Sequence, residues 1–166
     1  MPNHTGAVGC KLFYSYLKDP PYQSLMTELV NDPEILVLHL TRRDRLRAYV
    51  SELRARDTGN WNDRKRPTQD QPKLQLEEPG FRTYQQDLES SQAWLNAELG
   101  QHRVYEVEYE EMVARPEQVL AGIQDALRVR PRKLFSLLVR QNPQPLENWV
   151  ANAAEARTWF PEPVHH

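Results

Sequence analysis

The feature that most constrains this fold is a short apolar run that leads directly into a basic turn and an amphipathic helix. The run occupies residues 35–40, reads Ile-Leu-Val-Leu-His-Leu and follows an Asp-Pro turn. An apolar run of this length, bounded by a turn, predicts a parallel strand that is buried on both faces. Residues 41–44, Thr-Arg-Arg-Asp, then open a helix whose apolar side chains recur at helical spacing from Leu46, with Gly59 expected as its C-terminal cap.

Short apolar segments alternate with longer amphipathic ones along the rest of the chain. We expect strands over 7–13, 35–40 and 104–109, and helices over 22–31, 41–58, 81–100, 116–127, 131–139 and 146–153. Residues 62–80 are polar and carry three prolines, which predicts a long mobile loop, and 161–166 are predicted to be a disordered tail. The alternation predicts a single α/β layered domain over 1–166, with a short parallel sheet flanked by helices.

Composition excludes several classes of protein before any motif is considered. The chain has 166 residues, with 21 Lys and Arg against 23 Asp and Glu, so its formal net charge is −2. This balance gives no general reason to expect nucleic-acid binding, and no apolar run approaches the ~18 residues that a membrane span needs. The N-terminus lacks the pattern of a secretory signal. The single cysteine, Cys10, excludes an internal disulfide and a multi-cysteine metal cluster, so we expect a cytoplasmic globular protein.

The charged residues are distributed unevenly. Residues 42–66 contain nine Lys and Arg against four Asp and Glu, which makes this stretch locally +5. A second basic cluster lies between Arg128 and Arg140 and includes Lys133. Two basic segments far apart in the sequence can converge on one anion, or they can be two solvated faces, and the charge pattern alone leaves both interpretations open.

The junction after the apolar run is the place where an anion is expected to bind. Ligands of open α/β sheets bind beyond the carboxyl ends of the strands, and a helix that starts there presents free N–H groups and the positive end of its dipole. Arg43 lies at this junction, and Ser51 follows eight residues later, about two helical turns on, so both side chains can face one phosphate. The alternative is that Ser51 is a solvated helix residue and the arginines are surface charges.

The segment 35–61 resembles a motif of the sulfotransferases that use 3′-phosphoadenosine-5′-phosphosulfate (PAPS), in particular the bacterial and phage branch of that superfamily. In that family a strand ending in arginine is followed by a helix with a serine eight residues later, and the pair binds the 3′-phosphate of the nucleotide. Arg43 and Ser51 match this spacing, and Arg42 replaces Arg43 if the junction is shifted by one residue. Further segments resemble the family in the same order: 8–12, 105–127 and 138–155.

The resemblance implies a P-loop-like three-layer α/β domain with PAPS as its co-substrate and no metal. It implies transfer of sulfate to an acceptor hydroxyl or amine. Its expected partners are the nucleotide and the acceptor; a membrane or nucleic acid is not expected, and a homo-oligomer is left open. In the superfamily, basic residues from a late segment close over the same phosphate, which makes Arg140 or Lys133 candidates here. Trp61 either stacks on the adenine or packs against the end of the helix.

One family feature has no counterpart in this sequence. The family begins with a strand and a loop rich in Ser, Gly and Thr, which holds the 5′-phosphosulfate. Residues 6–11, Gly-Ala-Val-Gly-Cys-Lys, lack the spacing of a phosphate-binding loop and the hydroxyl residue after its lysine. We therefore expect a chain that is N-terminally truncated relative to the family.

The residues that would carry catalysis are poorly defined by the sequence. Lys11, on the strand expected at 7–13, and His39, within the apolar run, are the candidates. A structural or surface role is the alternative for Lys11, and a hydrogen-bonded position in the core is favoured for His39 over a role as general base. The histidines show no metal-ligand spacing, so no metal site is expected.

Two other functions are compatible with parts of this pattern. One is a non-catalytic remnant of a sulfotransferase, which would keep the 3′-phosphate subsite and bind nucleotide without transferring sulfate. The other is a domain that binds nucleic acid through the basic helix at 42–56. The latter is disfavoured because Asp44, Glu52 and Asp57 dilute the positive charge of that helix.

Overall fold

The computed structural model describes residues 6–59, 61, 72–134 and 144–159. The chain divides into two compact units: unit 1 comprises Met1–Arg43 and Asp87–Leu134, and unit 2 comprises Asp44–Gln86 and Phe135–His166. Each unit therefore combines two segments that are distant in the sequence. The single domain expected over 1–166 stays a prediction.

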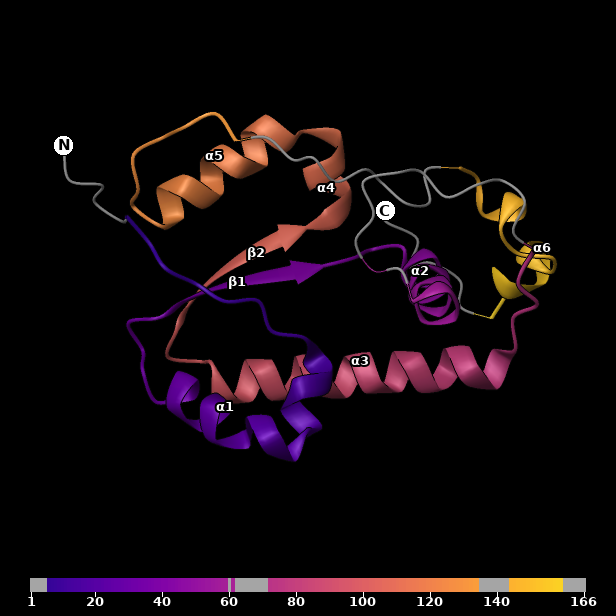
Figure 1. The fold of residues 1–166 in the computed structure, drawn as a ribbon, viewed down its shortest axis with the longest axis horizontal. Coiled ribbons are helices and arrows are strands. Elements are labelled where there is room, and N and C mark those ends of the chain that lie inside the picture. The colour runs from indigo at the N-terminus through magenta and orange to yellow at the C-terminus, as the bar shows by residue number, and fades with distance from the viewer. Residues whose placement is uncertain (1–5, 60, 62–71, 135–143, 160–166) are drawn as a thin grey trace. The chain divides into compact units, whose positions relative to one another are not determined.

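Unit 1 is built on two parallel strands, β1 (Leu36–Thr41) and β2 (Arg103–Glu108), which lie side by side in Figure 1. The register runs from Leu36 opposite Arg103 to Thr41 opposite Glu108. Parallel strands need a crossover connection, and the chain between these two strands includes two helices. The strands expected at 35–40 and 104–109 are confirmed, and so is the α/β class with a short parallel sheet flanked by helices.

Helices flank both sides of this sheet. α4 (Tyr109–Ala114) and α5 (Pro116–Ala126) contact β2, and Pro116 is the first residue of α5, as expected. Figure 1 shows α1 (Gln23–Val30) and the part of α3 (Glu78–Glu98) that belongs to unit 1 on the other side of the sheet. Two short 3-10 helices precede α1: η1 (Tyr14–Lys18) and η2 (Pro20–Tyr22).

Two expectations for unit 1 are wrong. Residues 7–13 form no strand, and Val8 is 91 % exposed. A strand must pair its backbone N–H and C=O groups with a neighbour, and the sheet in the described residues consists of β1 and β2 alone. The run at 35–40 does form a strand, but Leu38 and Leu40 are 41 % and 52 % exposed. Because α4 and α5 pack on β2, they leave these leucines of β1 open to solvent.

Unit 2 has a hydrophobic core of its own, to which α2 (Arg45–Thr58) contributes Val50. The buried members of this core are Val50, Leu76, Leu146, Trp149, Val150, Ala153 and Ala156. Both ends of α2 follow from the local sequence. The Asp44 carboxylate accepts a hydrogen bond from the Arg47 N–H at 2.8 Å, and Gly59 ends the helix with a φ of 65°, a conformation that favours glycine.

Several element boundaries in the described residues differ from the expected ones. α3 begins at Glu78, inside the loop expected at 62–80, because a proline such as Pro79 is tolerated in a first helical turn. The helix expected at 146–153 is split into η3 (Leu146–Asn148) and α6 (Ala153–Ala156). The reason is that the Ala151 N–H donates to the Leu74 carbonyl at 2.8 Å, outside any helix.

Other expected elements lie partly or wholly outside the described residues. Residues 131–134 lie in no helix, and the remainder of the helix expected at 131–139 is not among the described residues. The same holds for the loop residues 62–71 and for the tail at 161–166.

Candidate functional site

Two arginines follow the carboxyl end of β1 in unit 1. Thr41 is the last residue of the strand, and Arg42 and Arg43 come next, immediately before the N-cap of α2. β2 ends alongside, with Glu108 opposite Thr41. The carboxyl ends of both strands therefore meet at one edge of the sheet, which is the place where open α/β sheets bind ligands.

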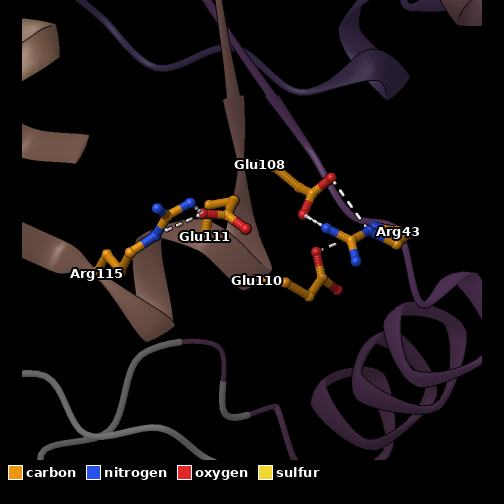
Figure 2. A network of polar contacts seen from close by, with 5 residues as sticks. All are labelled: Arg43, Glu108, Glu110, Glu111 and Arg115. Atoms are coloured by element: carbon orange, nitrogen blue, oxygen red, sulfur yellow. Dashed lines mark hydrogen bonds and ion pairs between the residues drawn. The ribbon is translucent and has the colours of Figure 1, made fainter. Parts of the chain in front are cut away.

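Arg43 is held by two carboxylates, one from the end of β2 and one from the start of α4 (Figure 2). Its Nε donates to Glu108 Oε2 at 3.2 Å, and its Nη2 donates to Oε1 of the same carboxylate. The backbone N–H of Arg43 donates to Glu110 Oε2 at 3.1 Å. The Glu108 carboxylate raises the pKa of the guanidinium above its ordinary value. Since 54 % of the Arg43 side chain is exposed, Arg43 is an ordered, charged donor that solvent can reach.

Arg42 stacks on α4. Its guanidinium carbon lies 4.4 Å from the centroid of the Tyr109 ring, which is a cation–π contact. Its Nε is buried and has no hydrogen-bond partner among the described residues. A buried donor without a partner is unfavourable, so this atom is a place where a ligand oxygen would be stabilising.

A surface pocket of about 400 Å³ runs along β2 next to this edge. Thr41 and Glu108 line it, together with Glu111 of α4 and Arg115. The last two form an ion pair, with Arg115 Nε 2.9 Å from Glu111 Oε2 (Figure 2). The pocket thus presents both signs of charge, and its carboxylates oppose any ligand that is purely anionic.

His39 lies at the centre of a second polar group in unit 1. Its Nδ1 is 2.9 Å from Oε1 of Glu106, which lies opposite His39 in the β1–β2 register, and its Nε2 is 2.5 Å from Oη of Tyr14 on η1. These partners indicate that Nδ1–H donates to the carboxylate and that Nε2 accepts from the hydroxyl. The His39 side chain is 13 % exposed. Burial raises the pKa of Tyr14 above its ordinary value, and the Gln92 side chain opposes that rise.

A smaller pocket of about 180 Å³ opens beside His39 and Glu106. Leu95 of α3, Leu99 just after that helix and Val104 of β2 supply apolar walls. The pocket can therefore hold a small, partly apolar group next to the histidine.

The nucleotide-binding residues expected outside this edge belong to other parts of the chain. Ser51 is partly buried on α2 in unit 2, whereas Arg43 belongs to unit 1, and their shared phosphate stays a prediction. Trp61, also in unit 2, is 56 % exposed.

The remaining candidates are basic residues. Lys133 is exposed, and Arg140 lies outside the described residues. Lys11 is exposed as well, with its Nζ 4.5 Å from the centroid of the Phe13 ring. The strand that was expected to carry Lys11 is absent from the described structure, so the sheet does not position this side chain.

Sequence reasoning missed the acidic partners of these residues. The alternating segment at 104–109 predicts a strand but does not say which strand it pairs with. Once β1 and β2 are paired in register, Glu106 falls opposite His39, and Glu108 falls beside the end of β1. The sequence also did not indicate a role for Tyr14, because the 3-10 helix that carries it has too few residues to show a periodic pattern.

The chain belongs to the sulfotransferase family, since a family model described as "Sulfotransferase family" matches residues 23–132. This range contains β1, β2, both arginines and α5. No curated protein matches the chain, and no solved structure does. Within the described ranges, no helix has both the length and the apolar composition that crossing a membrane requires. The same ranges contain no group of three or more His, Cys, Asp or Glu side chains that could hold a metal ion.

Proposed function

We propose that this chain binds the 3′-phosphoadenosine end of PAPS at the carboxyl edge of the unit 1 sheet and transfers the sulfuryl group to an acceptor hydroxyl or amine. The observation that carries the proposal is the position of Arg43. It is a charged, accessible arginine between the end of β1 and the start of α2, within the segment that matches the sulfotransferase family. A cytoplasmic location is part of the proposal, because a chain with one cysteine suits a reducing compartment.

The donors at this edge are of the kind that a phosphate requires. An arginine presents paired N–H groups that match two oxygens of an oxyanion. The buried Nε of Arg42, which lacks a partner in the described structure, would gain one from a phosphate oxygen. The proposal adds further nucleotide contacts from residues outside this edge: Ser51, Trp61, Lys133 and Arg140.

Sulfuryl transfer breaks the bond between sulfur and the bridging phosphate oxygen and forms a bond from the acceptor atom to sulfur. The acceptor loses one proton, and adenosine 3′,5′-bisphosphate leaves. By analogy with phosphoryl transfer, the protein contributes positioning and stabilisation of developing charge. In this proposal Arg42 and Arg43 fix the nucleotide end of the donor, and the acceptor occupies a separate subsite.

His39 is the proposed acceptor of that proton. Its Nε2 accepts from the Tyr14 hydroxyl, which would pass its own proton to the imidazole as it takes one from the acceptor, and the Glu106 carboxylate at Nδ1 would stabilise the imidazolium that forms. Lys11, the other candidate, is exposed, and its ammonium lies over the ring of Phe13. The contacts therefore favour the histidine.

Isothermal titration calorimetry with adenosine 3′,5′-bisphosphate tests the nucleotide half of the proposal. We expect the wild-type chain to bind and the double variant Arg43→Ala/Ser51→Ala to lose at least about tenfold in affinity, because charged hydrogen bonds to the phosphate are removed. Arg82→Ala is the matched control, because Arg82 is an exposed arginine of α3 whose Nε donates to Glu78 at 2.8 Å, in unit 2. No binding by the wild-type chain at millimolar nucleotide would refute the proposal.

Transfer of labelled sulfate from PAPS to hydroxyl and amine acceptors tests the catalytic half. We expect labelled product with the wild-type chain and much less with Arg43→Ala at limiting PAPS. Nucleotide binding without transfer to any acceptor would instead favour the non-catalytic nucleotide-binding module.

A further inference from the structure

Glu108 occupies the edge of Arg43 that an arginine ordinarily offers to a phosphate. The Nε and Nη2 groups of Arg43 form the fork that grips an oxyanion through two parallel hydrogen bonds. In this structure both groups donate to the carboxylate of Glu108 (Figure 2). The backbone N–H of Arg43, a third donor at the same junction, is taken by Glu110.

The charges around this edge are balanced. Within unit 1, three glutamates act on Arg43, which are Glu108, Glu110 and Glu111. The positive charges set against them are those of Arg43, of the adjacent Arg42 and of Arg115, which pairs with Glu111. An incoming phosphate therefore meets no net positive charge unless a carboxylate moves away. The Glu108 side chain is 31 % exposed, so solvent reaches the group that would have to move.

We propose that Glu108 is a built-in competitor for the 3′-phosphate at Arg43. The inference rests on the proposed function, since it concerns the same nucleotide subsite. A phosphomonoester carries up to two negative charges and three acceptor oxygens, whereas a carboxylate carries one charge and two oxygens. The phosphate therefore displaces Glu108, and the cost of displacement weakens the net affinity.

The competitor has a consequence for turnover. PAPS and the product adenosine 3′,5′-bisphosphate carry the same 3′-phosphate, so tight binding of that group would hold the product as strongly as the substrate. Product release limits the rate of many enzymes. When the phosphate leaves, the Glu108 carboxylate pairs with Arg43 again. This competition lowers the affinity for the product and speeds its release.

The competing explanation is that Glu108 orients Arg43 for the phosphate. The two roles give opposite results for Glu108→Gln, which keeps the size of the side chain and removes its charge. If Glu108 competes, the variant binds adenosine 3′,5′-bisphosphate more tightly. If Glu108 orients Arg43, the variant binds more weakly.

The experiment is a calorimetric titration of wild type, Glu108→Gln and Glu111→Gln with adenosine 3′,5′-bisphosphate and with adenosine 5′-monophosphate. Glu111 is the matched control, because it is a neighbouring glutamate that pairs with Arg115 instead of Arg43. We expect Glu108→Gln to bind the bisphosphate about two- to fivefold more tightly, the range for an exposed ion pair, with a smaller gain in Glu111→Gln. Affinity for the monophosphate, which lacks the 3′-phosphate, should not change in Glu108→Gln.

Each other outcome overturns the inference. Unchanged or weaker binding of the bisphosphate by Glu108→Gln excludes competition. An equal gain of affinity in Glu111→Gln would show that removing any nearby negative charge has the same effect. Binding of the bisphosphate by neither wild type nor Glu108→Gln would refute the proposed function together with this inference. Binding by wild type without a gain in Glu108→Gln refutes only the inference. Thermal melting of each variant confirms that it is folded.

Discussion

At the level of single residues, hydrogen-bond partners decide what His39 can do. The sequence places this histidine on a strand and favours a hydrogen-bonded position, but it cannot name the partners. Glu106 comes from a strand 67 residues away, and Tyr14 comes from a segment with no periodic pattern. Long-range register, which side-chain periodicity does not encode, brings the three groups together. The same limit applies to Arg43, whose partner Glu108 is set by the pairing of β1 with β2.

Replacing Tyr14 by Phe tests the contacts of His39. The variant removes the hydroxyl that Nε2 accepts from, so we expect the imidazole ¹⁵N resonances of His39 to shift and the folding free energy at neutral pH to fall by about 1 kcal/mol. Tyr16→Phe is the control, because Tyr16 lies on the same 3-10 helix and stacks on Tyr22. Unchanged His39 resonances in Tyr14→Phe would contradict the hydrogen bond.

The same variant has a signature at high pH. Burial raises the pKa of Tyr14 in the folded chain above the ordinary value of 10.0. The folded state therefore keeps a proton that the unfolded state loses, and the stability from this group, present below pH 10.0, is lost as pH rises through the raised pKa. We expect denaturant unfolding to show a smaller alkaline loss of stability in Tyr14→Phe than in wild type. An equal loss in both chains would show that Tyr14 does not titrate in this way.

At the level of elements, the sequence predicted most of the helices and both strands of the described sheet, but it did not predict how deeply β1 is buried. The end of α2 at Gly59 was predicted, because a C-terminal cap depends on neighbouring residues. Its start was expected at Thr41, but Thr41 ends β1 and the helix begins at Arg45, after the N-cap Asp44. β1 was also predicted, but its burial was not. Leu38 and Leu40 are exposed because burial depends on where α4 and α5 pack, and that packing is not local. The strand expected at 7–13 failed for a related reason, since a strand exists only with a partner.

Asp44 provides a test of the start of α2. Its carboxylate accepts from the Arg47 N–H at the start of α2, so Asp44→Ala should lower the folding free energy by about 1 kcal/mol in urea unfolding. Asp44→Asn, which keeps the acceptor oxygen, should recover most of this loss. Asp57→Ala, near the other end of α2, is the control and should have less effect. Equal losses in Asp44→Ala and Asp57→Ala would show that the cap contributes nothing specific.

At the level of the whole molecule, the chain passes from unit 1 to unit 2 within residues 23–132, which the family model matches. Arg43 ends the first segment of unit 1, and Asp44 begins unit 2. Spacing predicted that Arg43 and Ser51 face one phosphate, and that prediction concerns residues from both units. The sequence located the arginines and the strand that carries them. It did not locate the carboxylates that hold Arg43, because those depend on the pairing of segments far apart in the chain.

The most direct test of the central claim is the contribution of the 3′-phosphate to binding, measured with and without the Arg43 side chain. Affinities of wild type and Arg43→Ala are compared for adenosine 3′,5′-bisphosphate and adenosine 5′-monophosphate. If Arg43 binds the 3′-phosphate, wild type prefers the bisphosphate by about tenfold or more, and Arg43→Ala loses most of that preference. An equal preference in both chains would contradict the claim and place the 3′-phosphate elsewhere.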